Sequence, residues 1–235
     1  MSVKRIKIRL YYLILDVSKF LIVSATKSEV QPLLEHYKFS VYGNEGIFST
    51  DSGPDLSVLI AGVGMVNTAF ALGRYSHNMF DYIINVGVCG AINRDLKLGQ
   101  VVNVVSDTLS EMGAENDKEF IKYANLNLGG TNEYYNQVDF KYEPLENLHK
   151  VSGITVNTIH GNEESISKVK TLFSADVESM EGAAFFRGCQ RLSENYFQVR
   201  AVSNYVEKRD KSKWDIPLAI KNVNEFAIKL IDDLH

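Results

Sequence analysis

Residues 82–92 of the chain read YIINVGVCGAI. The first part, YIINV at 82–86, is apolar on successive positions, which is typical of a strand covered on both faces in a largely parallel sheet. The glycine-rich segment NVGVCGAI at 85–92 is expected to turn at the end of that strand, where small residues let the backbone approach a flat ligand closely. No Gly-Lys-Ser/Thr pattern follows, so the segment is not a P-loop.

Five more short apolar runs are distributed along the chain, and amphipathic stretches separate them. This alternation predicts an α/β fold: a single domain with a mixed, mostly parallel central sheet flanked by helices. Periodicity indicates helices over about 66–79, over about 180–192, and after Asp215, which can cap the last helix with Pro217 in its first turn. The other expected strands are FLIV at 20–23, SVLIA at 57–61, VVNVV at 101–105, ITV at 154–156 and FQVRAV at 197–202.

Two stretches depart from this pattern. Residues 106–150 are rich in Asn, Glu, Tyr and Gly without a clean period, so we expect loops there, which often carry ligand specificity. Residues 1–19 begin basic and carry an apolar run that is interrupted by Asp16 and Lys19 and is too short to span a bilayer. We interpret them as an N-terminal extension, either disordered or foreign to the native chain, and place the domain at 20–235.

The composition favours a small-molecule ligand over a nucleic acid or a membrane. The 235 residues are 45% hydrophobic and 23% charged, which suffices for a packed core, and the net charge of -4 opposes binding to a phosphate backbone. Cys89 and Cys189 share no metal-like spacing with each other or with the five histidines, so we expect no disulfide, no metal and no cofactor. A reducing cytoplasm is the simplest location for such a chain.

The first of four candidate segments is SATKSEV at 24–30, which leads from a predicted strand into a helix. Open α/β sheets bind their ligands at such strand ends. Thr26 or Ser28 can cap the helix, and Glu29 then lies in its first turn. The carboxylate of Glu29 either complements the helix dipole or takes part in chemistry, and the segment alone favours the first reading.

The remaining segments are AGVGMVN at 61–67, the glycine-rich NVGVCGAI, and a fourth that covers 177–185 and 199–214. In the fourth, Glu178 and Glu181 stand three residues apart at a helix start, and Arg200 lies within a predicted strand. A structural ion pair would explain these charges as well as a functional cluster does. A charged residue in a buried strand nevertheless needs a partner, which favours the cluster.

In this order, the four segments resemble those of the nucleoside phosphorylase and nucleosidase superfamily over residues 21–235. The resemblance implies two catalytic residues: Glu29 activates water, and Asn204, four residues after Arg200, binds the purine. It also implies that Glu181 holds the ribose hydroxyls, that Met180 packs beneath the sugar, and that Arg200 is delivered to the same site.

The same resemblance places the base against Cys89 and Gly90, with Ile159 lining its pocket. Two differences from related families indicate which nucleophile and which base the chain uses. Adenine-specific nucleosidases carry Asp at the position of Asn204, and the phosphorylases carry a hydroxyl residue near Val88 and an N-terminal GDPxR-like loop that this chain lacks. The chain is therefore expected to use water, not phosphate, and to favour a 6-oxopurine, since an amide both donates and accepts a hydrogen bond.

Among members of the superfamily, the SMEGAAF and SNYVEKRDKSKW stretches are most similar to futalosine hydrolases, which release hypoxanthine from futalosine in menaquinone biosynthesis. Arg209, Lys211 and Lys213 are candidates to bind the benzoate tail of that nucleoside, or else form a solvated face. The resemblance also favours a homodimer. A nucleosidase for inosine, methylthioinosine or methylthioadenosine/adenosylhomocysteine and a non-catalytic nucleoside-binding protein remain alternatives, although binding alone does not require Glu29.

Overall fold

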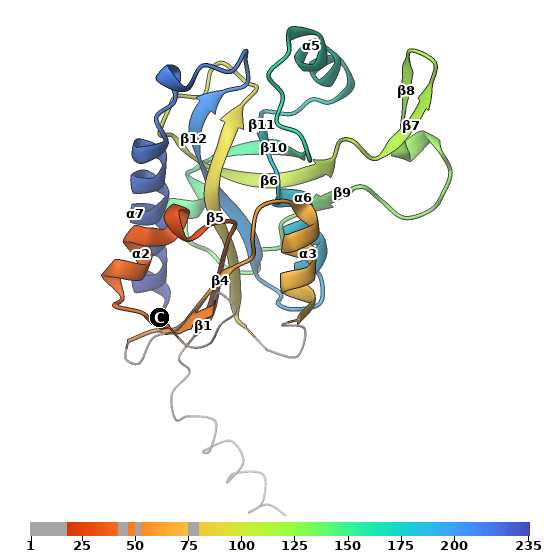
Figure 1. Ribbon diagram of the computed structural model, residues 1–235. Coiled ribbons are helices and arrows are strands. Elements are labelled where there is room, and N and C mark those ends of the chain that lie inside the picture. The colour runs from red at the N-terminus through yellow and green to blue at the C-terminus, as the bar shows by residue number, and fades with distance from the viewer. Residues whose placement is uncertain (1–17, 42–46, 50–52, 75–79) are drawn as a thin grey trace, which may run out of the picture.

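One mixed sheet organises the computed structural model, which describes residues 18–41, 47–49, 53–74 and 80–235 (Figure 1). Within these ranges ten strands join in the order β11-β10-β6-β12-β5-β1-β4-β3-β2, with β9 paired to β6. The strands are β1 (Lys19–Ser24), β2 (Ser40–Val41), β3 (Ile47–Ser49), β4 (Asp55–Ile60), β5 (Tyr82–Ala91), β6 (Val101–Leu109), β9 (Glu133–Tyr135), β10 (His149–Thr155), β11 (Val177–Ser179) and β12 (Tyr196–Tyr205).

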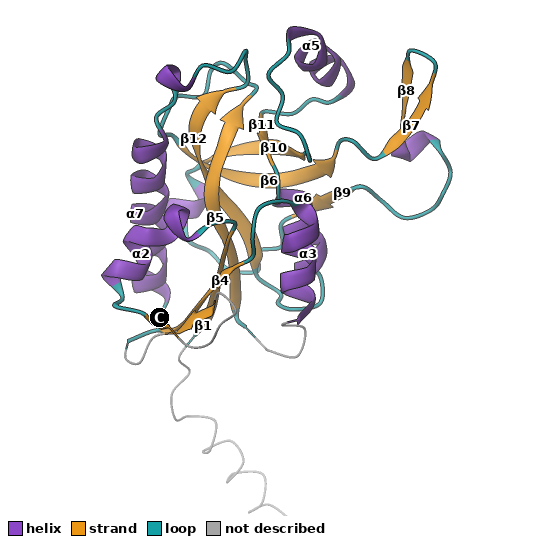
Figure 2. Cartoon of the chain, in the orientation of Figure 1, coloured by secondary structure: helices purple, strands orange, loops and turns teal. Residues whose placement is uncertain are grey.

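Helices cover both faces of the sheet, as the sequence predicts (Figure 2). On one side lie α2 and α7, and on the other lie α3 and α6. The helices are α2 (Gln31–His36), α3 (Met65–Arg74), α4 (Glu143–Glu146), α5 (Glu163–Leu172), α6 (Gly182–Cys189) and α7 (Ile216–Leu234), with short 3₁₀ turns η1 (Lys27–Val30), η2 (Tyr123–Asn125) and η3 (Lys211–Lys213).

The strands that surround the candidate residues close into a ring, in which β12 runs antiparallel to β6. β5 pairs in parallel with β1 and β12, and it also pairs antiparallel with β11. This last contact closes β5, β12, β6, β10 and β11 upon themselves. Apolar side chains such as Val102, Val151 and Val202 cluster among these strands. The carboxyl ends of β1, β4, β5 and β12 are thereby held beside one another at the edge where ligands bind in such sheets.

The last helix begins as expected. The carboxylate of Asp215 accepts the backbone N–H of Leu218 at 3.1 Å, and a proline stands in the first turn. Its apolar stripe, including Val223 and Ala227, is buried against Ile22 of β1 and Leu33 of α2 in the larger core cluster. On the opposite face, α3 and α6 pack on each other and on the sheet.

The structure corrects four sequence expectations. β5 does not turn at 86 but continues through the glycines to Ala91, because β12 pairs with it along that whole length. The predicted helix over about 180–192 is shorter, from Gly182 to Cys189. Within 106–150, where loops are expected, β7 (Gly113–Asn116) and β8 (Glu119–Lys122) form a hairpin.

The fourth correction concerns Lys19, which belongs to β1 although the sequence assigns it to an extension. Residues 1–17, which hold the rest of that expected extension, lie outside the described residues. The last five residues of the helix expected over 66–79 also lie outside them. None of the helices that the structure describes is long and apolar enough to cross a membrane.

Candidate active site

Glu29 is fixed at the start of the first helical segment. Its Oε2 atom accepts the backbone N–H of Thr26 at 3.0 Å, which is one half of a capping box in η1. The same atom accepts the Thr26 hydroxyl at 2.8 Å. Its Oε1 atom reaches across to β5 and accepts the backbone N–H of Val88 at 3.2 Å. Glu29 can therefore stabilise the helix start and still take part in chemistry. One of its oxygens bonds the turn at Thr26, and the other faces β5.

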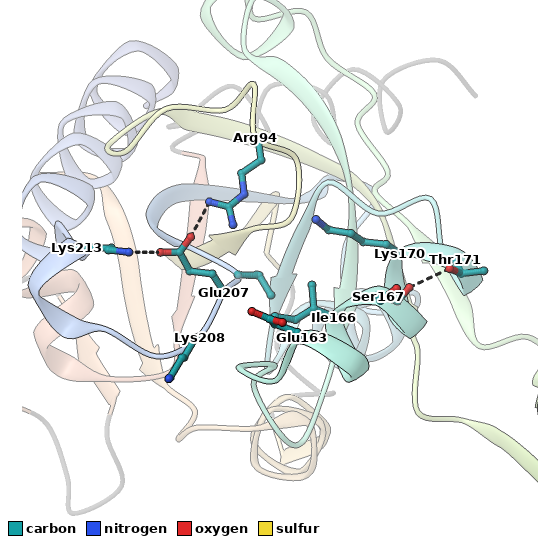
Figure 3. A pocket seen from close by; sticks show the side chains of 10 residues that line it. Arg94, Glu163, Ile166, Ser167, Lys170, Thr171, Glu207, Lys208 and Lys213 are labelled. Carbon is teal, nitrogen blue, oxygen red and sulfur yellow. Dashed lines mark hydrogen bonds and ion pairs between the residues drawn. The ribbon is translucent and has the colours of Figure 1, made fainter. Parts of the chain in front are cut away.

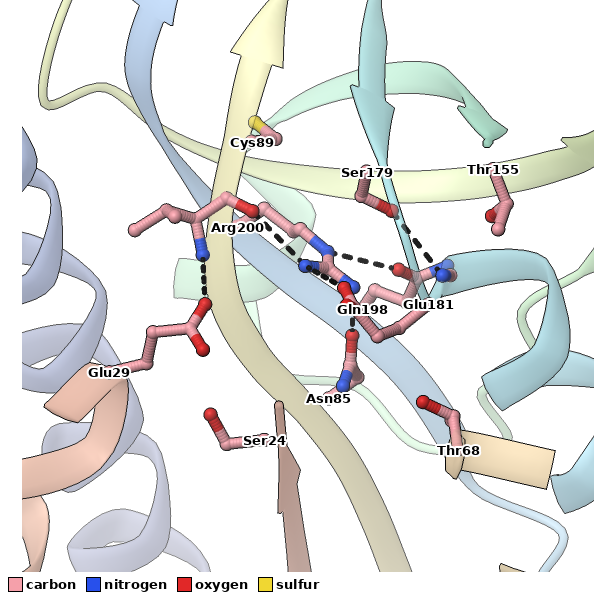
Figure 4. A network of polar contacts seen from close by, with 12 residues as sticks. Ser24, Glu29, Thr68, Asn85, Cys89, Thr155, Ser179, Glu181, Gln198 and Arg200 are labelled. Atoms are coloured by element: carbon pink, nitrogen blue, oxygen red, sulfur yellow. Dashed lines mark hydrogen bonds and ion pairs between the residues drawn. The ribbon is translucent and has the colours of Figure 1, made fainter. Parts of the chain in front are cut away.

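The peptide groups of Val88 connect Glu29 to Arg200. While the N–H of Val88 donates to Glu29, its carbonyl accepts from Arg200 Nη1 at 3.1 Å (Figure 4). Gly87 precedes Val88, and a Cβ atom built on it would lie 2.9 Å from Glu29 Oε1 and 3.1 Å from Arg200 Nη1. A side chain at position 87 would therefore press on both polar groups, which explains the need for glycine at this point.

Glu181 lies on the other side of Arg200, at the start of α6. Its Oε2 atom is 3.4 Å from Arg200 Nη1, and its Oε1 atom accepts the backbone N–H of Gly64 at 3.0 Å. Gly64 has a φ of 96°, a conformation that glycine adopts readily, so the turn after β4 can aim its N–H at this carboxylate. Both ionic side chains are almost fully buried, which only a paired arrangement permits.

A second layer of polar side chains holds the guanidinium of Arg200. Nη2 donates to Asn85 Oδ1, and Nε donates to Gln198 Oε1 at 3.3 Å (Figure 4). The other end of Gln198 donates to Asp107, whose second oxygen accepts the Thr155 hydroxyl at 2.7 Å. Burial raises the pKa of Asp107 to about 6, although its hydrogen bonds and the charge of Arg200 oppose that rise. This chain fixes the position of Arg200 from the side away from Glu29.

Asn204 stands at the end of β12 opposite Gly90. A β-bulge between Val202 and Asn204 shifts the register there, and such bulges re-aim side chains next to active sites. The amide oxygen of Asn204 accepts the hydroxyl of Ser203 at 2.8 Å, and its NH₂ group donates to the carbonyl of Tyr205 at 3.1 Å. Because a carbonyl can only accept, the Tyr205 carbonyl fixes which way the amide points.

Glu178 and His160 form a hydrogen-bonded pair close to Asn204. The two acidic residues of the fourth segment thus separate: Glu181 pairs with Arg200, whereas Glu178 Oε2 lies 2.6 Å from His160 Nδ1. The hydrogen bond to Glu178 raises the pKa of His160, and burial partly opposes it. Sequence reasoning passed over His160, although it directly follows Ile159 in the segment expected to line the base.

The other residues predicted to bind the substrate differ in how deeply they are buried. Met180 is partly buried between β11 and α6, next to Glu181, and Ile159 is 47% exposed in the loop after β10. The thiol of Cys89 packs in the apolar cluster among the ring strands, where burial raises its pKa to about 12. Its carbonyl accepts the hydroxyl of Ser203 at 3.2 Å. Cys89 therefore supports the site from within the core and does not reach it with its side chain.

A wide cleft of about 680 Å³ opens between α5 and the segment after β12 (Figure 3). Glu207 spans it with ion pairs to Arg94 at 2.8 Å and to Lys213 at 3.3 Å. Of the three cations considered for a substrate tail, Lys213 lines this cleft, whereas Arg209 stacks over the ring of Trp214 with its guanidinium 4.9 Å from the ring centroid. Lys211 is exposed at the start of η3.

The family model described as the phosphorylase superfamily matches residues 19–234, nearly the whole chain. The chain belongs to the phosphorylase superfamily. Futalosine hydrolase of Thermus thermophilus is 28% identical over 204 residues, covering 83% of this chain and 87% of that protein. A 5'-methylthioadenosine/S-adenosylhomocysteine nucleosidase of Colwellia psychrerythraea is 27% identical over 195 residues, covering 76% and 78%. The structure of futalosine hydrolase of Helicobacter pylori superposes with a TM-score of 0.76 at 15% identity, covering 93% and 99%.

In this member of the phosphorylase superfamily, the four sequence segments meet at one place, as predicted. Glu29, Gly64, Val88, Glu181 and Arg200 form a continuous set of contacts. Sequence reasoning did not identify four residues that contact the motif residues directly or through one another. They are Asn85, Gln198, Asp107 and His160. Three of them are buried polar residues within strands, a pattern that resembles ordinary core until the pairing of β5, β6 and β12 is known.

Proposed function

We propose that the chain hydrolyses the N-glycosidic bond of a purine nucleoside and that futalosine is its substrate, with hypoxanthine as the released base. The observation that carries this proposal is the pairing of Glu29 with the Val88 amide next to the Arg200 and Glu181 cluster, while an amide side chain, Asn204, stands at the adjacent strand end. The family supports the reaction class, and the relative from Thermus thermophilus supports the choice of substrate.

Glu29 is placed to activate water. Cleavage of a purine nucleoside passes through an oxocarbenium-like state, which requires a nucleophile on the face opposite the leaving base. The Glu29 carboxylate accepts three hydrogen bonds, and two carboxylate oxygens offer about four acceptor positions. One position is therefore left to hold a water molecule and to receive its proton.

Glu181 and Arg200 suit the sugar side of the reaction. Glu181 is held by Gly64 and Arg200, so its carboxylate is preorganised where it can accept hydrogen bonds from ribose hydroxyls. Its negative charge then lies near the cation that develops on the sugar, which lowers the barrier. Met180, adjacent to Glu181, provides apolar contact beneath the sugar.

Asn204 determines the choice of base in this proposal. Hypoxanthine presents acceptors and a donor at its edge, and an amide matches both, whereas an ionised carboxylate only accepts. Gly90 lies opposite Asn204, and its missing side chain lets Val206 and the Asn204 amide pack closely against the strand. The edge of the pocket would be completed by Ile159.

The relative from Colwellia psychrerythraea, named for an adenine nucleoside, supports a second candidate, since it is almost as similar as the futalosine hydrolase. The decisive experiment incubates the purified protein with futalosine, inosine and 5'-methylthioadenosine and measures free hypoxanthine and adenine by chromatography. Hypoxanthine from futalosine at the highest kcat/KM supports the proposal. Adenine as the main product replaces it with the adenine nucleosidase, and no free base from any substrate favours a binding protein.

We also propose a homodimer in the cytoplasm. An apolar patch on α3 and the turn before it includes Val66 and Phe70, which are 76% and 68% exposed, together with Val63. Exposed apolar surface of this kind marks association sites. Light scattering after size exclusion should give a molar mass twice that of one chain. In Phe70→Glu the measured mass should fall to that of one chain. Cys89 and Cys189 are both free and buried, which suits a reducing compartment, and fractionation of cells tests the location.

A further inference from the structure

A buried carboxylate next to the proposed base site has no role in the mechanism so far. Glu178 in β11 is only 2% exposed. Both of its oxygens are engaged by one residue: Oε1 accepts the backbone N–H of His160 at 3.0 Å, and Oε2 lies 2.6 Å from His160 Nδ1. A carboxylate so deeply buried is costly to retain unless it is paired, and here the partner is a side chain that can carry a proton.

The pair borders the place where the base is proposed to bind. A Cβ atom built on Gly90 would lie 3.0 Å from Val206 Cγ2, 3.4 Å from Asn204 Nδ2 and 3.8 Å from Glu178 Cγ. Asn204 and Glu178 therefore lie on the same side of Gly90, packed around it with Val206, and Glu178 connects that side to His160. Ile159, which precedes His160, is the residue that the proposed function assigns to the pocket edge.

The charges around His160 favour its protonated form. Glu178 faces it from β11, Glu111 from the turn between β6 and β7, and Glu115 of β7 and Lys168 of α5 line the same cavity of about 270 Å³. The hydrogen bond to Glu178 and the charges of Glu178 and Glu111 raise the pKa of the ring, while burial lowers it. Since Nδ1 is engaged and no described residue is found to bond Nε2, the second ring nitrogen can serve as a donor.

The proposed reaction also requires an acid that Asn204 cannot supply. A leaving purine accepts an electron pair and needs a proton or a strong hydrogen bond to carry it, and an amide does not give up a proton at neutral pH. We propose that His160, held by Glu178, is the catalytic acid that protonates the leaving base. The proposal rests on the nucleosidase function proposed above and adds a catalytic residue to it.

The bond between C1′ and N9 breaks and its electron pair goes to the purine, to which the imidazolium of His160 transfers a proton from Nε2. The water oxygen forms the new bond to C1′, and the water proton goes to Glu29. His160 is left neutral and Glu29 protonated, so the return of a proton from Glu29 to His160 through solvent restores the enzyme.

The pH dependence of kcat/KM on futalosine tests the acid. His160→Gln should lower kcat/KM by roughly 100-fold to 10,000-fold and abolish the fall of activity at high pH, since that fall reports loss of the imidazolium proton. Glu178→Gln should keep the fall but move it to lower pH. His36→Gln, an exposed histidine on α2, is the matched control and should match the wild type. A His160→Gln enzyme with the wild-type pH profile, whatever its absolute rate, overturns the proposal.

A second measurement does not depend on turnover. In nuclear magnetic resonance spectra of ¹⁵N-histidine-labelled wild-type protein, added hypoxanthine should shift the ring signals of His160 and leave those of His36 in place. Failure of hypoxanthine to bind, or binding without a shift of His160, contradicts the proposed contact. If the wild type cleaves no 6-oxopurine nucleoside, the proposed function is wrong. The spectrum is an independent test, since it reports whether His160 contacts bound hypoxanthine even without turnover.

Discussion

The carboxylate of Glu29 accepts the backbone N–H of Val88 at 3.2 Å, so the first and third candidate segments meet directly. Phosphorylases that this chain resembles carry a hydroxyl residue near position 88 to bind phosphate, whereas here a carboxylate faces that backbone and would repel an anion. The relationship therefore indicates which nucleophile the site accepts.

Hydrolysis should proceed without phosphate. Because Glu29 places negative charge beside Val88, inorganic phosphate is excluded and water is the only acceptor. Initial rates on futalosine should be the same with and without added phosphate, with free ribosyl product in both cases. A strong rise in rate together with a sugar 1-phosphate product would establish a phosphorylase instead.

Glu29→Gln should reduce kcat by at least about 100-fold, because the amide is nearly isosteric but cannot take a proton from water. The affinity for substrate should stay within several-fold, as measured by calorimetry. Glu35→Gln is the matched control, since Glu35 lies exposed on α2 and its carboxylate accepts the side-chain amide of Gln31. Near wild-type turnover by Glu29→Gln would mean that Glu29 serves only the helix start.

Gly87→Ala should impair catalysis far more than folding. The added methyl group would stand 2.9 Å from Glu29 Oε1 and 3.1 Å from Arg200 Nη1, so these two side chains must move apart. A displacement of about 1 Å in a catalytic group can cost on the order of 100-fold in rate. Gly73→Ala in α3 meets nothing within 4 Å and is the control. Equal kcat/KM for the two variants would show that catalysis does not depend on the close approach of Glu29 and Arg200 beside position 87.

Asp107 should make stability depend on pH in the acid range. Its pKa in the folded protein is raised to about 6, so between about pH 4 and pH 6 the folded state binds more protons than the unfolded state. The free energy of unfolding from this group therefore falls as pH rises through that range. Urea unfolding at several pH values should show the fall in the wild type and not in Asp107→Asn. Asp107→Asn should also lose activity. The new amide nitrogen cannot accept the hydrogen bond from Gln198, so Gln198 would turn away from Arg200.

The sequence predicts most of the fold and the meeting of its four motifs, because apolar runs and helical periodicity are local signals. Glu29 and Glu181 are accessible to sequence reasoning as charges at predicted helix starts, and Arg200 as a charge within an apolar strand. The continuation of β5 through Gly87 and Gly90 is not, since it depends on pairing with β12 more than 100 residues later. The pairing of Glu178 with His160 instead of Arg200 likewise depends on where the loop after β10 returns.

Asn204→Asp should change the choice of base. Asn204 reads a 6-oxopurine by donating and accepting at once, and its orientation is fixed by the Tyr205 carbonyl, which accepts its NH₂ group at 3.1 Å. Aspartate can repeat the donation only when protonated, so two acceptors face each other at neutral pH. Sites that hydrogen-bond a particular group reject a mismatched analogue by up to roughly 10,000-fold, and we expect less here because a protonated Asp partly compensates.

The measurement compares kcat/KM for futalosine and for its 6-amino analogue in the wild type and in Asn204→Asp. The wild type should release hypoxanthine from futalosine and leave the amino compound almost untouched, whereas Asn204→Asp should shift the ratio towards the amino compound, most clearly at low pH. Ser203→Ala is an informative companion, because it removes one of the hydrogen bonds that hold the Asn204 amide and should weaken selectivity without reversing it. Equal wild-type rates on the two nucleosides would refute this role of Asn204. The choice of futalosine over an adenine nucleoside would then lose its main argument from the residues.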